Sequence, residues 1–158
     1  MSLIWPEIEN KDFMNSVTDV AKAEIGYIED QGNKTKYGEW FGLNGLPWCG
    51  IFVSWCFAMA GKPLPNIGFK KGFAGVQFAY DYYKNMNRLT IAPKEGDIVL
   101  YDFDANGRYD HTGIFLRWVE GKKKFEAIEG NTSVKSQRNG GSVMLRVRNN
   151  INVKFVNI

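Results

Sequence analysis

The chain has 158 residues, of which 44% are hydrophobic and 15% are aromatic. This length suffices for one domain with a substantial core and is too short for two, so we expect a single domain over residues 1–158. The net charge of +3 is mildly basic, and the one run of three lysines, 122–124, is typical of a solvated hairpin. Because no basic stripe is present, the sequence argues against a nucleic-acid partner.

The sequence gives no indication of membrane insertion. No apolar stretch reaches the roughly 18 residues that a membrane span requires. The N-terminal stretch MSLIWPEIENKD lacks a basic region followed by an apolar core, so we expect no export signal in this chain itself. A signal or a preceding domain of a longer protein is compatible with this expectation.

The first predicted element is an amphipathic helix. Asn10 is expected to cap it, Phe13 and Val17 begin its apolar face, and Gly26 is expected to end it. Residues 29–47 are rich in glycine, asparagine and aromatics, which predicts an ordered loop.

Two further helices are expected before the strands of the second half of the chain. Pro47 suits a helix entrance, and residues 49–60 are apolar on nearly every side, which indicates a buried helix that ends at Gly61. Residues 72–86 predict a shorter third helix.

The second half of the chain has a β pattern. Short runs with alternation or β-branched and aromatic enrichment are separated by glycine-rich turns. The expected strands are DIVLYDF, HTGIFLRWV, KFEAIEG, SVMLRVR and NVKFVNI. Helices first and strands later predict an α+β fold in which N-terminal helices pack on a mainly antiparallel sheet.

The two cysteines, Cys49 and Cys56, lie seven positions apart in the apolar helix. Seven residues of helix separate their Cα atoms by about 10 Å, whereas a disulfide needs less than about 7 Å. We therefore expect two free thiols.

Position distinguishes these two thiols. Cys49 begins the predicted helix, where unpaired backbone N–H groups and the helix dipole stabilise a negative charge on sulfur. Cys56 lies two turns deeper among apolar residues, where desolvation and restricted access argue against chemistry. Cys49 is the candidate nucleophile, and simple burial is the alternative for both.

A cysteine nucleophile needs a group that takes and returns its proton, and His111 is the only histidine. It begins a predicted strand. Glu129 and Asn131 end the next strand two positions apart, so either could orient the imidazole. Asp110 is less well placed because neighbouring strand residues face opposite ways. One histidine and two cysteines without CxxC or HxxxH spacing do not predict a metal site.

Together these stretches resemble the CHAP family, the cysteine, histidine-dependent amidohydrolases/peptidases of the papain-like superfamily. The matching segments are KYGEWFGLNGLPWCGIFVSWCFAMAG, EGDIVLYDFDANGRYDHTGIF and IEGNTS, in the order of the family. The resemblance implies a papain-like fold and cleavage of peptidoglycan, at the amide between N-acetylmuramate and L-alanine or at a peptide bond.

The resemblance also implies residue roles. Cys49 would be the nucleophile, His111 the general base and acid, Glu129 the orienting residue and Asn131 a supporting partner. The Cys49 backbone N–H and one further donor would hold the oxyanion of the tetrahedral intermediate. In related wall hydrolases a tyrosine twelve positions before the cysteine has the second place, which corresponds to Tyr37.

One departure from the family concerns calcium, which some phage CHAP lysins bind through acidic residues around the cysteine. No carboxylate occupies those positions here, so we expect no metal and no cofactor. The positions hold Trp40, Gly42, Asn44, Leu46 and Ile51. Trp40, Phe41 and Trp48 are candidates for a substrate groove, with core packing as the alternative.

Three functions follow as hypotheses. The first is a monomeric peptidoglycan amidase or endopeptidase that acts at the bacterial wall, either as a phage lysin released through the host membrane or as part of a secreted or tail protein. The second is a catalytically inert wall-binding or scaffold module, which an intact Cys, His and Glu set argues against. The third is an amidase with a non-wall substrate. A deep, closed pocket would favour this third hypothesis, whereas a long open groove would favour the first.

Overall fold

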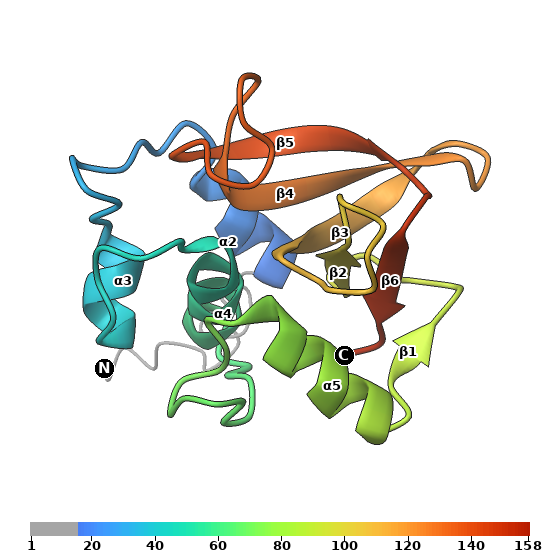
Figure 1. Ribbon diagram of the computed structural model, residues 1–158, viewed down its shortest axis with the longest axis horizontal. Helices are drawn as coiled ribbons and strands as arrows, with labels where there is room; N and C mark the ends of the chain where they lie inside the picture. The colour runs from blue at the N-terminus through green and yellow to red at the C-terminus, as the bar shows by residue number, and fades with distance from the viewer. Residues whose placement is uncertain (1–15) are drawn as a thin grey trace, which may run out of the picture.

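A computed structural model of the chain describes residues 16–158 (Figure 1). The helices are α2 (Val17–Ala23), α3 (Lys36–Phe41), α4 (Cys49–Met59) and α5 (Val76–Asn85). The strands are β1 (Leu89–Thr90), β2 (Ile98–Tyr101), β3 (His111–Glu120), β4 (Lys124–Thr132), β5 (Ser142–Asn149) and β6 (Val153–Val156). No helix within this range is long and apolar enough to cross a bilayer.

The six strands form one sheet in the order β1-β6-β2-β3-β4-β5, and every neighbouring pair is antiparallel. The helices gather below this sheet in Figure 1, and α4 packs against β3 and β4. The predicted α+β fold with helices on an antiparallel sheet is therefore confirmed.

Helix α4 occupies the centre of the core, as its apolar sequence predicts. It begins at Cys49 and ends at Met59, and eight of its residues are buried. Its end is a glycine cap: Gly61 has φ +73°, and the N–H groups of Gly61 and Lys62 donate to the carbonyls of Ala58 and Phe57 at 3.0 and 2.9 Å. The C-terminal end of the helix is thus fixed by local sequence.

Some predicted boundaries differ from the structure. Helix α2 has its N-cap at Ser16, whose hydroxyl accepts from the backbone of Asp19, while the expected cap Asn10 and Phe13 lie outside the described residues. Helix α5 begins at Val76 instead of residue 72. The short strand β1 was not predicted.

A helix also interrupts the predicted loop 29–47. Thr35 caps α3 by accepting from the backbone N–H of Gly38 at 2.9 Å, and Gly42 ends it with φ +90°. The glycines that suggested a loop thus include the residue that ends this helix.

Apolar side chains pack on both faces of the sheet. One cluster lies between the helices and the sheet, with Phe52 of α4 and Ile114 of β3 among its members. A second cluster contains Tyr101, Phe125 and Phe155 on the other face. The ring of His111 lies beside Tyr101, with 5.6 Å between ring centroids, so the second cluster forms one wall of the candidate site.

Candidate active site

Cys49 is the first residue of α4, and glycine permits its helix to approach the sheet closely. A Cβ atom on Gly130 of β4 would lie 2.7 Å from the Cβ of Phe52 and 2.8 Å from Cζ3 of Trp48. Because glycine has no side chain, the N-terminal turn of α4 packs directly on β4. Cys49 is a free thiol with 3% of its surface exposed.

His111 begins β3 and faces both the thiol and a carboxylate. Its Nε2 lies 2.8 Å from Oε1 of Glu129, and both side chains are fully buried. Its Nδ1 has no hydrogen-bond partner within residues 16–158. Burial lowers the pKa of His111, but the neighbouring Cys49 thiol and Glu129 outweigh it and raise the pKa to about 9. Since Glu129 occupies Nε2, Nδ1 is the nitrogen available to sulfur.

Glu129 stays ionised although its side chain is fully buried. Arg148 of β5 binds both of its oxygens: Nε donates to Oε2 at 2.8 Å, and Nη2 donates to Oε1. Burial raises the pKa of Glu129, but hydrogen bonds from Arg148 and His111 reverse this and lower it to about 2. Arg148 was not found by sequence reasoning.

Gly113 makes room for this carboxylate. It lies two residues after His111 on the same face of β3, and a Cβ there would lie 2.7 Å from Cγ of Glu129 and 2.9 Å from the carbonyl oxygen of Ile128. The side chain of Glu129 therefore passes over a position that must be glycine. In the sequence, the glycine two positions after His111 is the signal for this close packing.

Asn131 does not join the imidazole. It has φ +56° at an irregular end of β4, which turns it away from the alternation expected for a strand. Its Oδ1 accepts from Gly141 N at 3.3 Å, and its Nδ2 donates to Asn139 Oδ1 at 3.2 Å. Asn131 thus stabilises the loop between β4 and β5, and it makes no hydrogen bond to His111 within the described residues.

Tyr37 also differs from expectation. It is fully buried in α3, and its hydroxyl donates its only proton to Glu24 Oε1 at 2.8 Å. Its ring packs against Phe52 and Trp55, on the second turn of α4. A hydroxyl that donates its proton to Glu24 has none left for an oxyanion at Cys49, so this geometry does not support the expected role.

The aromatic groove candidates divide into two groups. Trp48 and Phe41 are each 1% exposed, and the Trp48 indole stacks on Tyr37 and donates to Glu29 Oε2 at 2.6 Å. These two belong to the core. Trp40 is half-buried, with Lys71 Nζ 4.9 Å from its ring centroid. It is the one residue of the three whose ring can meet a substrate.

Cys56 has surroundings that suppress reactivity. It is fully buried, and burial together with the negative charge of Glu24 raises the pKa of its thiol well above the usual value. The expectation that Cys56 is an inert core residue agrees with this geometry. Both cysteines are free, as predicted.

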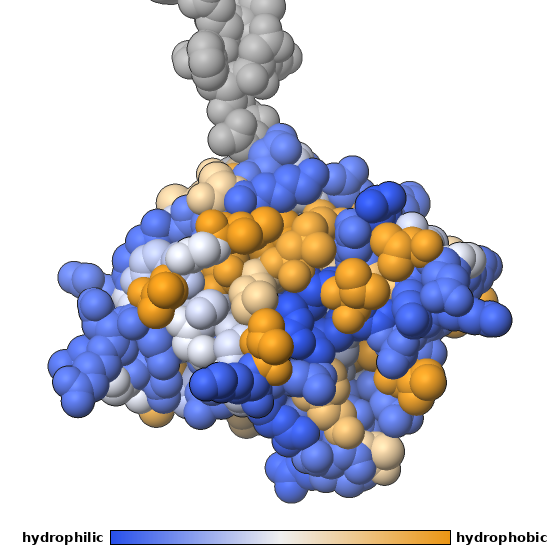
Figure 2. All heavy atoms as spheres, turned by 90° about the horizontal axis from the view of Figure 1, so that it is seen from above, coloured by the Kyte–Doolittle hydropathy of each residue, from blue (hydrophilic) through white to orange (hydrophobic). Residues whose placement is uncertain are grey.

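The loop between β4 and β5, whose Gln137 binds Arg148, is joined by ion pairs to the loop between β2 and β3. Arg138, in the loop between β4 and β5, binds Asp104 at 2.8 Å and Asp110 at 2.7 Å in the loop between β2 and β3. A hollow of about 380 Å³ lies beside them, lined by Tyr101, Phe103 and Arg148 among others. Figure 2 views the molecule from the side of β5 and shows apolar patches separated by hydrophilic residues.

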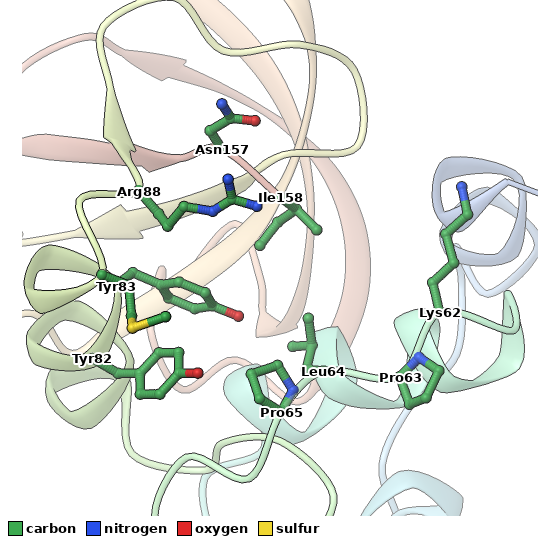
Figure 3. A pocket seen from close by; sticks show the side chains of 10 residues that line it. Lys62, Pro63, Leu64, Pro65, Tyr82, Tyr83, Arg88, Asn157 and Ile158 are labelled. Atoms are coloured by element: carbon green, nitrogen blue, oxygen red, sulfur yellow. The ribbon is translucent and has the colours of Figure 1, made fainter.

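A larger hollow of about 530 Å³ lies elsewhere, between the segment after α4, the end of α5 and the C-terminal residues (Figure 3). Leu64, Tyr83 and Ile158 contribute to its mainly apolar wall. Neither Cys49 nor His111 is among the residues that line this hollow or the hollow of about 380 Å³, so the size of a hollow does not locate the candidate site. The described residues also contain no group of three or more His, Cys, Asp or Glu side chains placed to hold a metal ion.

Comparison with protein families identifies the chain. The family model of the CHAP domain matches residues 41–131, which include Cys49, His111 and Glu129. The chain belongs to the CHAP family. This membership implies a hydrolase of the amidohydrolase or peptidase type. A search of curated proteins found no match. Arg148 lies beyond the matched segment.

Proposed function

We propose that this CHAP domain is a cysteine-dependent peptidoglycan hydrolase that cleaves an amide or peptide bond of the bacterial wall. The observation that carries the proposal is the arrangement of Cys49 at the start of α4, with His111 Nδ1 available to its sulfur and His111 Nε2 bound to Glu129. A thiol, a proton acceptor and an orienting carboxylate are the groups that acyl transfer requires.

In the first half of the reaction, the Cys49 thiol gives its proton to His111 Nδ1, and the thiolate attacks the carbonyl carbon. The carbonyl π electrons move onto oxygen and form a tetrahedral oxyanion. As this intermediate collapses, the C–N bond breaks and His111 Nδ1 passes its proton to the departing amine. The product is a thioester on Cys49, with His111 neutral again.

In the second half, His111 Nδ1 takes a proton from water, and the resulting hydroxide attacks the thioester carbonyl. Collapse of the second tetrahedral intermediate breaks the C–S bond and releases a carboxylic acid. The thiolate and the imidazolium are regenerated as a pair. Throughout, Glu129 accepts from Nε2 and does not leave that position.

The first turn of α4 supports stabilisation of the oxyanion. The backbone N–H groups of Cys49, Gly50 and Ile51 precede the first intrahelical bond, from Phe52 N to Trp48 O at 2.8 Å. Trp48, the N-cap residue, has no side-chain capping bond. The Cys49 N–H is therefore the first donor of the proposed oxyanion hole, and Tyr37 is not the second.

Peptidoglycan is the proposed substrate because the resemblance to the CHAP family implies wall hydrolysis. The proposal places the enzyme at the bacterial wall and treats it as a monomer. The deciding experiment is mass spectrometry of fragments released from purified Gram-positive peptidoglycan by wild-type protein and by Cys49→Ala. Fragments released only by the wild type support the proposal, and their new termini distinguish an amidase from an endopeptidase.

Two results would contradict the proposal. Equal release by both proteins would exclude Cys49 as the nucleophile. Absence of release from every wall type tested, with folded protein, would favour a wall-binding module or an amidase with another substrate.

A further inference from the structure

Arg148 contacts the candidate site in a way that the acyl-transfer scheme does not use. Its guanidinium binds both oxygens of Glu129, donates from Nη1 to Gln137 Oε1 at 2.6 Å, and lies 4.9 Å from the centroid of the Phe103 ring. The residue is only 7% exposed. A buried cation with a partner in each of these directions is fixed in one orientation.

The position of Arg148 in the sheet indicates that its contact with Glu129 is specific. In the strand register Arg148 lies opposite Phe125, whereas Glu129 lies opposite Met144. The Arg148 side chain therefore extends along the sheet, past its direct neighbour, to reach the carboxylate. Ordinary cross-strand pairing does not produce such a contact, as Arg117 and Glu126 illustrate by lying directly opposite each other.

The charges of the site require a cation at this place. With Glu129 ionised, the group formed by Cys49, His111 and Glu129 carries one net negative charge, whether the proton is on sulfur or on Nδ1. Burial penalises this charge, and the simplest relief is a proton on Glu129. Arg148 supplies the compensating charge instead.

Other charged or titratable groups around the pair do not replace Arg148. The Tyr101 hydroxyl is buried without a hydrogen-bond partner in the described range and is neutral. Arg146 donates to Thr132 Oγ1 at 3.1 Å and to Ser133 O at 2.5 Å. Asp110, before β3, is bound to Arg138.

We infer that Arg148 is a positioning residue: by binding Glu129 it keeps that carboxylate a hydrogen-bond acceptor, which holds the proton of neutral His111 on Nε2 and leaves Nδ1 free for the proton of Cys49. Without Arg148, a protonated Glu129 would donate to Nε2. The ring proton would then move to Nδ1, and His111 could no longer accept from the thiol. The catalytic meaning of this inference rests on the proposed function.

The sole histidine of the chain makes a direct test possible, because ¹⁵N NMR of a labelled sample gives the ring signals of His111 alone. The measurement is made in a Cys49→Ala background at a pH above the titration of the ring. With Arg148 present, we expect the Nε2–H tautomer. Arg148→Gln is expected to shift the ring toward Nδ1–H. The matched control is Arg117→Gln, which removes an exposed guanidinium from a carboxylate on the same sheet and should leave the tautomer unchanged.

Activity gives a second, independent readout in chains that retain Cys49. Arg148→Gln should lower kcat/KM by about 10²-fold, because the base is present in the wrong tautomer. Glu129→Gln/Arg148→Gln should be no less active than Glu129→Gln alone, because Arg148 acts through Glu129. This double variant also lacks an unpaired buried charge, so it serves if either single variant folds poorly.

Retention of the Nε2–H tautomer in folded Arg148→Gln would overturn the inference, and so would losses of activity that add in the double variant. The NMR result needs no substrate. A tautomer shift in a protein that releases nothing from peptidoglycan would therefore support the role of Arg148 and contradict only the proposed function.

Discussion

Helix α4 carries two cysteines, one at its first residue and one in its interior, in opposite surroundings. Cys49 begins the helix beside His111, with unpaired backbone N–H groups around it. Cys56 lies two turns later, fully buried near the carboxylate of Glu24, which with burial raises the pKa of its thiol. We therefore expect the reactivity of each thiol to depend on its position along this helix.

The largest expected loss of activity follows from substitution of Cys49. Cys49→Ser should lower kcat/KM by at least about 10³-fold, because an alkoxide is far harder to form here than a thiolate. The free energy of unfolding should change by less than about 1 kcal/mol, since the two side chains are similar in size. Release of soluble wall fragments and urea unfolding measure the two quantities. An active Cys49→Ser variant would contradict the assignment.

A smaller loss is expected when the start of α4 is moved. In Gly130→Ala the new Cβ would lie 2.7 Å from Phe52 and 2.8 Å from Trp48, so the first turn must shift away from β4. A displacement of about 1 Å can cost about 10²-fold in rate, and overpacking typically costs about 1–3 kcal/mol of stability. Kinetics and urea unfolding on the same sample separate these effects. Unchanged activity would show that close packing on β4 does not position Cys49.

The pH dependence should follow His111. Burial lowers the pKa of His111, but Cys49 and Glu129 outweigh this effect and raise the pKa to about 9. The value of kcat/KM should therefore fall above about pH 9, where the imidazolium loses its proton. The raised pKa also stabilises the fold. This contribution is complete below the unfolded value near 6.5 and is lost as pH rises through about 9. The pH profile of kcat/KM and urea unfolding midpoints between pH 6 and 10 test these two expectations. A fall in kcat/KM already near pH 7 would contradict a His111 imidazolium stabilised by Cys49 and Glu129.

Cys56 provides the matched control for Cys49. Cys56→Ala should retain activity within about twofold and cost about 1 kcal/mol of stability through the small cavity it leaves. Fragment release and urea unfolding measure these outcomes. If Cys56→Ala lost activity as fully as Cys49→Ser, the contrast between the two cysteines of α4 would be wrong.

The smallest effect is expected from metal removal. No carboxylate occupies the positions where some CHAP lysins bind calcium, so treatment with EGTA should leave the rate of fragment release unchanged. A strong loss that calcium restores would show that the loop before Cys49 binds the ion through other oxygens.

The sequence predicted those features that depend on local pattern. The α+β layout, the start of α4 at Cys49 and the end of the helix near Gly61 follow from apolar patterning, a proline entrance and a glycine stop. Helix α3 was missed because its six residues are too few to show a period, although Thr35 and Gly42 are ordinary cap residues.

Features that depend on register and packing were not predictable. Arg148 lies four positions out of register with Glu129, so no spacing in the sequence links them. Asn131 leaves its expected face because the end of β4 is irregular and its φ is positive. The role expected for Tyr37 came from family resemblance, and no sequence spacing could show that its hydroxyl donates to Glu24.

The most direct test of the central claim compares the alkylation of the two cysteines by iodoacetamide, followed by peptide mapping, in wild-type protein and in His111→Ala. We predict that Cys49 reacts much faster than Cys56 in the native wild type, and that His111→Ala slows Cys49 by at least about 10²-fold without affecting Cys56. Equal reactivity of the two thiols, or an unchanged Cys49 rate in His111→Ala, would contradict the proposal that His111 activates Cys49 at the start of α4.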